Sequence, residues 1–391
     1  MLNHQRFAVG FDPVKNGFMP FADQLIGVDV AEQLVRELHA VDPHNQLQNL
    51  KAAVSTLDPL SLRERSDTLR DALLADYPQS YLQLSTVIKS AHASPSFSGW
   101  MLWPVTSAVA TRATEENTAE SFNDAMELLA LLTSRLTSEF AIRVLLKHDL
   151  QSALTFVQQW TISSDEHVRR LASEGTRPFL PWAVRVPEII QKPDLTIPVL
   201  DELYKDDSEY VRRSVANHLN DLSRNEPELV IQTAGRWLQS PAPTTVKLVK
   251  HGLRTLIKRG NPEALALLGF GTPTVDVNGP LVQAPEVPWG GEVNFTATIR
   301  NTGNEPMKLA VDYVLHHQKA NGSTTAKVFK LTTRTLSPGE AMDIDRSHSF
   351  KAITTRRYYP GTHAVALQIN GVPTTPTQFE LLPERSAGLE T

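Results

Sequence analysis

Acidic residues that stand one helical turn from a basic residue recur three times between positions 139 and 221. The three sets share i,i+4 spacing: Glu139–Arg143, Arg170–Glu174 and Arg213–Asn217–Asp221. Carboxylates from neighbouring helices that face one point can stabilise a developing positive charge or orient a water molecule. The same spacing also fits ordinary surface ion pairs, worth about 0.3–0.5 kcal/mol each. Spacing alone therefore leaves a hydrolytic site and a solvated surface both open.

Basic and aromatic residues supply two further candidate binding features. Four basic residues recur at three- and four-residue spacing on what would be one helical face: Lys247, Lys250, Arg254 and Lys258. Such a stripe can follow DNA phosphates, although a solvated helix face has the same pattern. Trp182 follows RPFLP, whose prolines prevent helix continuation. Its ring could stack on a base or a cation, or simply pack against the next helix.

These residues fall in a region of helical periodicity that ends near residue 270. The expected helices cover roughly 28–41, 60–76, 117–136, 138–147, 149–160, 165–174, 208–222, 226–238 and 244–258. The strings VRRLASEG and VRRSVANH begin 43 residues apart, and TVKLVKHGL is a weaker third copy. Repeats of about 35–47 residues are typical of HEAT-like helix pairs, which stack into a solenoid. Stacking would bring the acidic sets to one concave wall.

After residue 270 the apolar residues alternate with period two. Short strands are expected in 291–301 and 307–315, and near 326–332, 341–347, 363–369 and 377–382, with NGS, SPGE and YPGT turns between them. This spacing predicts an immunoglobulin-like β-sandwich. We therefore expect a multidomain chain, α then β, with a helical solenoid domain over 1–268 and a sandwich domain over 272–384.

Composition excludes several classes of protein. The 391 residues are 41% hydrophobic and include no cysteine, which excludes disulfide scaffolds, iron–sulfur clusters and thiol nucleophiles. HExxH, P-loop and GxSxG motifs are absent, so neither a metal nor another cofactor is expected. The chain shows no secretory signal and no run of 18 apolar residues, which predicts a cytoplasmic protein with no membrane partner.

The net charge of −5 argues at first against nucleic acid as a partner. The charge is unevenly divided, however. Residues 1–135 carry 10 basic and 16 acidic residues, whereas 136–270 carry 17 and 16, and 271–391 carry 11 of each. The excess of acidic residues thus lies outside the segment with the three acidic sets. The net charge therefore does not exclude DNA as a partner, but it requires the DNA-binding basic surface to be a local one.

Three strings carry a family resemblance. SEFAIR (138–143), VRRLASEGTRPFLPW (168–182) and YVRRSVANHLNDLS (210–223) resemble the alkylpurine DNA glycosylases of the HEAT-like-repeat superfamily, AlkC type, over about residues 15–268. An immunoglobulin-like domain after the repeats is similar to one subgroup of that type. The resemblance implies Glu139, Glu174 and Asp221 as catalytic carboxylates and Trp182 as the substrate-binding aromatic. Phe179 departs from the family, which often has a basic residue there, and a phosphate contact at that position would be altered.

The resemblance implies a bacterial base excision repair enzyme that hydrolyses the glycosidic bond of cationic bases such as 3-methyladenine in duplex DNA without base flipping. No lysine lies in the three strings that carry the acids, so we expect a monofunctional hydrolase that forms no Schiff base with the substrate. We expect a monomer that associates with the nucleoid during repair. The expected DNA-binding residues are Arg143, Arg170, Arg177, Arg213, Lys247, Lys250, Arg254, Arg356 and Arg357. The alternative is a non-catalytic DNA-structure binder or scaffold on the same fold.

Overall fold

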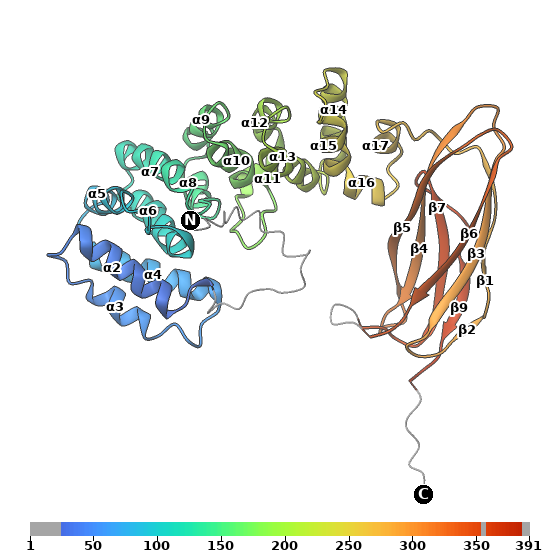
Figure 1. Cartoon of the computed structure of the whole chain (residues 1–391), viewed down its shortest axis with the longest axis horizontal. Helices are drawn as coiled ribbons and strands as arrows, with labels where there is room; N and C mark the ends of the chain where they lie inside the picture. The colour runs from blue at the N-terminus through green and yellow to red at the C-terminus, as the bar shows by residue number, and fades with distance from the viewer. Residues whose placement is uncertain (1–24, 353–356, 385–391) are drawn as a thin grey trace, which may run out of the picture. The chain divides into compact units, whose positions relative to one another are not determined.

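The computed structural model describes residues 25–352 and 357–384, with helices first and strands after them (Figure 1). The predicted order of fold classes is therefore confirmed. By packing, the chain divides into two compact units. The first runs to Leu229 and takes in Trp237–Gly252, and the second comprises Val230–Arg236 and the chain from Leu253 on.

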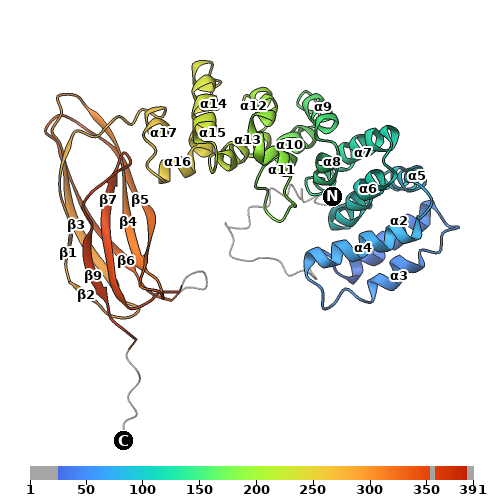
Figure 2. The same cartoon turned by 180° about the vertical axis from the view of Figure 1, so that it is seen from behind.

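Antiparallel helix pairs build the first unit, and the last helices belong to the second (Figures 1 and 2). The α-helices are α2 (Val28–Val41), α3 (Gln48–Val54), α4 (Leu62–Asp76), α5 (Tyr81–Ala91), α6 (Leu102–Glu116), α7 (Ala119–Leu132), α8 (Ile142–His148), α9 (Leu150–Trp160), α10 (Glu166–Gly175), α11 (Pro187–Gln191), α12 (Ile197–Leu203), α13 (Glu209–Leu222), α14 (Pro227–Gln239), α15 (Thr245–Gly252), α16 (Arg254–Lys258) and α17 (Pro262–Ala266). Short 3₁₀ helices, η1 (Gly99–Met101) and η2 (Pro193–Thr196), connect some of them. None of the helices in the described ranges is long and apolar enough to cross a membrane.

The helical repeats predicted around the two VRR strings pack directly on one another. α10 contacts α13, and α13 contacts α15. Each of these helices buries its apolar stripe, and α10 and α13 also bury the acids Glu174 and Asp221. The two VRR strings therefore occupy equivalent positions in neighbouring helices.

Two of the differences from the predicted helix boundaries affect the placement of candidate site residues. The segment expected to be helical from residue 138 starts its helix only at Ile142, so Glu139 lies in the turn before α8. The segment 244–258 is broken at Leu253 into α15 and α16. Apolar periodicity continues through both places, because it records which side is buried and not whether the backbone hydrogen bonds continue.

The strands form two sheets that enclose an apolar core (Figure 2). One sheet has the order β1 (Val275–Val282), β3 (Glu292–Asn301), β6 (Ala341–Ser349). The other has the order β2 (Glu286–Val287), β9 (Thr377–Leu381), β7 (Gly361–Ile369), β4 (Met307–Gln318), β5 (Thr324–Leu336), with β8 (Val372–Pro373) beside β7. Alternate residues such as Val293, Phe295 and Ile299 face the core, as the period of two predicted.

The helices α16 and α17 pack on the sandwich within the second unit. A Cβ added to Gly260 would lie 2.6 Å from the Gly371 carbonyl oxygen, so both glycines allow the two backbones to meet. Lys308 Nζ also donates to the Leu268 carbonyl at 2.9 Å. The domain boundary predicted at 268–272 falls between α17 and β1, but the packing places these two helices with the sandwich.

A histidine cluster lies inside the sandwich. The ring of His317 is 6.0 Å from that of His348 and 5.8 Å from that of His363. Burial lowers the pKa of His348 to about 4, and burial also lowers the pKa of His363. The Tyr313 hydroxyl lies 2.9 Å from His348 Nδ1. His348 and His363 are therefore neutral near pH 7.

Acidification is expected to destabilise the sandwich. An unfolded histidine binds a proton near pH 6.5, whereas folded His348 resists protonation down to about pH 4. The stabilisation is complete above about pH 6.5 and falls below it by up to about 1.4 kcal/mol per pH unit. Denaturant titrations of the whole chain across this window would show the loss. The variant His348→Gln should lose less stability on acidification, and an identical slope for both proteins would contradict the assignment.

Candidate active site

The helix α10 supplies the central acid of the site. Asp165 caps the helix by accepting the His167 backbone N–H at 2.8 Å. At the other end, a Cβ added to Gly175 would lie 2.8 Å from Ile142 Cγ2, so this glycine lets α10 finish close against α8. The polar face of α10 then points Glu174 toward α13.

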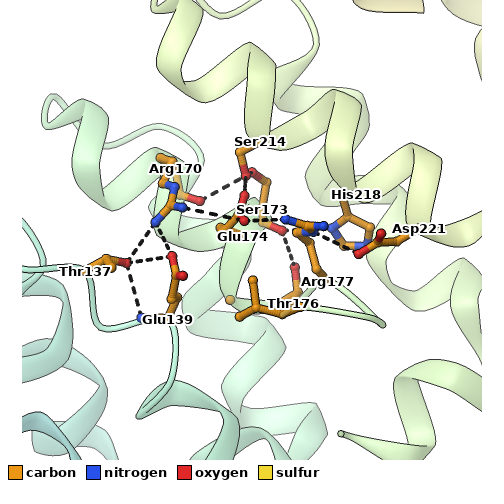
Figure 3. A network of polar contacts seen from close by, with 12 residues as sticks. Thr137, Glu139, Arg170, Ser173, Glu174, Thr176, Arg177, Ser214, His218 and Asp221 are labelled. Atoms are coloured by element: carbon orange, nitrogen blue, oxygen red, sulfur yellow. Dashed lines mark hydrogen bonds and ion pairs between the residues drawn. The ribbon is translucent and has the colours of Figure 1, made fainter. Parts of the chain in front are cut away.

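Five charged side chains alternate in sign from the turn before α8, through α10 and the loop after it, to α13 (Figure 3). Arg170 forms ion pairs with Glu139, in the turn before α8, and with Glu174 at 3.6 Å. Arg177 pairs with Glu174 at 2.5 Å and through Nε with Asp221 of α13 at 2.9 Å. The two arginines thus join the three predicted carboxylates into one row, which we call the acid row.

The acid row is largely buried, and its arginines keep the central acid, Glu174, ionised. Burial opposes the charge on Glu174, but Arg170, Arg177 and a hydrogen bond from Ser214 outweigh it and lower its pKa below the usual value. The carboxylates correspondingly raise the pKa of Arg170 and Arg177 against the effect of burial. In the described ranges, no group of three or more His, Asp and Glu side chains is placed to hold a metal ion.

The side chains of α13 add hydroxyl and imidazole groups behind Glu174. Ser214 Oγ donates to Glu174 Oε2 at 2.6 Å and lies 2.5 Å from the Ser173 hydroxyl. Burial lowers the pKa of His218 to about 4, so the ring is neutral and its Nδ1–H donates to the Ser173 carbonyl at 2.8 Å. Its Nε2 lies 3.1 Å from Thr196 Oγ1. These contacts hold α10 and α13 in one register.

The sequence prediction missed Ser214 and His218, although a signal was present. They precede Asp221 at i−7 and i−3, so one face of α13 carries all three residues. Serine and histidine on the face that carries an acid indicate buried polar packing behind the acid.

The three acids differ in the oxygens left available. Glu174 uses both oxygens, Oε1 with the arginines and Oε2 with Ser214. Within the described residues, Glu139 Oε1 and Asp221 Oδ1 accept no hydrogen bond, because the contacts of these residues use Oε2 and Oδ2. Glu174 is therefore the centre that holds the row, while Glu139 and Asp221 each keep an oxygen for water or substrate.

The predicted phosphate contacts at Arg143 and Arg177 do not fit their placement. Arg143 is fully buried and donates to the carbonyl oxygens of Val184, Gly175 and Arg177. Burial, with Arg185 and Arg177 nearby, lowers its pKa to about 10. Arg177 is also buried, and its guanidinium forms ion pairs with two acids. Arg143 thus fixes the loop after α10, and Arg177 fixes the acids.

The i,i+4 pairings are replaced in part by contacts between helices. Arg170 and Glu174 do pair within α10, at 3.6 Å. The pairing expected between Glu139 and Arg143 is wrong, because Glu139 precedes the helix and meets Arg170 instead. Asp221 pairs with Arg177 and not with a residue of its own helix.

The basic stripe predicted along one helix is also divided. Lys247 and Lys250 belong to α15, whereas Arg254 begins α16. Lys247 pairs with Glu209 of α13 at 2.9 Å and, with Arg213, lines a hollow of about 50 Å³ between α13 and α15. A basic surface therefore exists at Arg213 and Lys247, but the four residues do not share one helical face.

Trp182 stands in the loop between α10 and α11. Its φ is +60°, a left-handed conformation that is uncommon for a bulky residue, and 46% of the side chain is exposed. Tryptophan is on average highly buried in folded proteins, so exposure of nearly half of this residue is unusual. The loop thus presents an indole ring to solvent, five residues after Arg177 of the acid row.

Comparisons with known proteins agree with this organisation. The family model described as "Uncharacterised protein YhaZ, C-terminal Ig-like domain" matches residues 276–383. The uncharacterized protein YhaZ of Bacillus subtilis is 33% identical over 315 residues, which are 80% of this chain and 85% of that protein. The structure of Pseudomonas fluorescens alkylpurine DNA glycosylase AlkC, bound to DNA with an abasic site analog, matches with a TM-score of 0.82 and 36% identity, over 93% of this chain and 100% of that one.

Proposed function

We propose that this chain, which belongs to the AlkC family of alkylpurine DNA glycosylases and to its subgroup with a C-terminal immunoglobulin-like domain, excises cationic N-alkylated bases such as 3-methyladenine from duplex DNA. The acid row carries this proposal, because two arginines hold Glu139, Glu174 and Asp221 together in one row of ion pairs. The DNA in the related AlkC structure contains an abasic site analog, which resembles the product of base excision.

The chemistry of the substrate accounts for the residue types. Alkylation of a ring nitrogen makes the base positive and weakens the glycosidic bond, so little acid catalysis is required. The sugar then develops oxocarbenium character, which preorganised carboxylates stabilise. A carboxylate oxygen can also orient and deprotonate the attacking water, as in glycoside hydrolysis. Glu139 Oε1 and Asp221 Oδ1 are the oxygens left available for these tasks.

Recognition without base flipping is consistent with the surface around the acid row. Hollows of about 50 and 10 Å³ lie in the helical unit, and none of the three acids lines either of them. Both are far smaller than the roughly 300 Å³ at which ligand pockets begin. Trp182 instead offers an exposed ring face, which attracts a cationic base by about 1–2 kcal/mol when water is excluded.

Release of free base from methylated duplex DNA tests the proposed function. The chain is expected to liberate 3-methyladenine and leave an abasic site, without the strand cleavage of a Schiff-base lyase. Chromatography of the released bases and gel analysis of the strand measure the two products. Tight DNA binding with no released base would favour the non-catalytic binder.

The sandwich supplies a second DNA contact in our proposal. The sequence cluster over 351–359 contains Arg356, which lies outside the described residues, and Arg357, whose guanidinium is 5.5 Å from the Tyr359 ring centroid. Tyr358 faces the sandwich core and is buried, so it is not available to DNA. We propose that Arg357, which is exposed, binds the duplex backbone.

The variant Arg357→Ala is expected to lower the salt dependence of DNA affinity, d log K/d log[salt], by about one and to weaken binding to all sequences alike. A point variant is preferable to deletion of 272–391, because α16 and α17 pack on the sandwich. Fluorescence anisotropy at several salt concentrations provides the measurement. Arg300→Ala, at an exposed arginine of β3, is the matched control, and equal slopes for both variants would remove Arg357 from the interface.

A further inference from the structure

Two exposed arginines converge on Phe179, next to the acid row. The Arg185 guanidinium carbon lies 5.2 Å from the Phe179 ring centroid, and that of Arg224 lies 4.7 Å from it. Both arginines are exposed, and neither has a carboxylate partner within the described residues. We call Arg185 and Arg224 the arginine pair, and Phe179 is the ring that both of them contact.

Local contacts hold the ring and both arginines in place. Phe179 lines a small apolar hollow of about 10 Å³ together with Ile189 and Leu222, so packing holds its ring in place. Arg185 Nη1 donates to the Leu180 carbonyl at 3.1 Å. Both faces of an aromatic ring carry negative potential, and a ring that meets two guanidiniums orients both.

The position of the pair relates it to the acid row. Phe179 follows Arg177 by two residues, and the Arg224 backbone N–H donates to the Asp221 carbonyl at 3.2 Å. Arg185 also contributes positive potential to the interior, since it is one of the groups that, after burial, lower the pKa of Arg143. Arg185 and Arg224 thus lie beside the acid row without a carboxylate partner of their own among the described residues.

We propose that Arg185 and Arg224, oriented by Phe179, bind the backbone phosphates of the DNA strand that passes the Asp221 end of the acid row. The proposal rests on the proposed function for the identity of the ligand. Guanidiniums present paired donors that match phosphate oxygens, and like charges brought to one ring are stabilised by an anion between or beside them. Their separation cannot exceed the two centroid distances taken together, which limits the pair to one phosphate or to neighbouring phosphates.

Anisotropy titrations on undamaged and abasic-analog duplexes, at several salt concentrations, test the proposal. The double variant Arg185→Gln/Arg224→Gln should lower the slope of log K against log[salt] by about one to two, one for each phosphate that the variant no longer neutralises. The control Arg36→Gln removes an exposed arginine of α2 that pairs with Glu32, and its slope should equal that of the unaltered chain.

The variant Phe179→Leu separates orientation from charge. It keeps both arginines and an apolar side chain for the hollow, so the salt slope should persist while affinity falls about threefold to tenfold, because the two arginine side chains are no longer ordered in advance. An unchanged slope in the double arginine variant would overturn the proposal, and so would an unchanged affinity in Phe179→Leu. Because binding to undamaged DNA needs no chemistry, these results are independent of the base-release assay, and a chain that binds through the pair but releases no base refutes only the glycosylase proposal.

Discussion

Replacement of Asp221 by asparagine is expected to slow base excision by about 10²–10⁴-fold while DNA binding survives. Asparagine keeps the shape of the side chain and one oxygen for Arg177, which now pairs with Asp221 at 2.9 Å. It removes the negative charge and replaces one carboxylate oxygen by an NH2 group. If the remaining oxygen accepts from Arg177, the NH2 group stands where Oδ1 was available to water or substrate. The loss therefore falls on the oxocarbenium-like transition state and on water activation, not on duplex recognition.

Single-turnover release of 3-methyladenine, with anisotropy on abasic-analog DNA beside it, measures the two effects separately. Glu226→Gln is the matched control, because Glu226 follows Asp221 by five residues but makes no contact with the acid row in the described structure. Glu174→Gln should slow base excision by a similar factor to Asp221→Asn, since it removes the negative charge at the centre of the acid row. Full activity of Asp221→Asn would show that this acid has been assigned wrongly.

Replacement of Arg177 by methionine is expected to destabilise the helical unit by about 3–5 kcal/mol. Arg177 is buried, and its guanidinium joins Glu174 at 2.5 Å and Asp221 at 2.9 Å. Methionine fills a similar volume but leaves both carboxylates buried with one cationic partner fewer. The pKa of Glu174 should then rise, because burial opposes its ionisation and Arg177 is one of the two cations that lower this pKa.

Denaturant titration followed by helical circular dichroism measures this loss in the unit that contains the acid row. A triple variant, Arg177→Met/Glu174→Gln/Asp221→Asn, is the informative companion, because it removes the buried charges together with their partner. It should recover much of the stability lost in Arg177→Met alone. A loss below about 1 kcal/mol in the single variant would mean that solvent screens the row, as for a surface ion pair.

Both predictions concern a site that the sequence located only in part. The acids were found because their i,i+4 partners and the repeated VRR strings mark them, and the pairing of Arg170 with Glu174 could be predicted from helical geometry alone. The roles of the arginines could not. Arg143 and Arg170 show the same spacing to an acid, yet Arg143 is fully buried among carbonyl groups while Arg170 joins two carboxylates.

The sequence by itself determined the fold class and the position of the change from helices to strands, and it singled out the three acids, whose catalytic role is our proposal. These features depend on local periodicity and on residue type, which each segment carries without its neighbours. Tertiary structure alone decided which charges meet, because Glu139 and Arg170 are 31 residues apart and Arg177 and Asp221 are 44 apart. Contacts of that range depend on how α10 packs on α13 and on the turn before α8. The same packing buries these ion pairs, which on spacing alone resemble surface pairs.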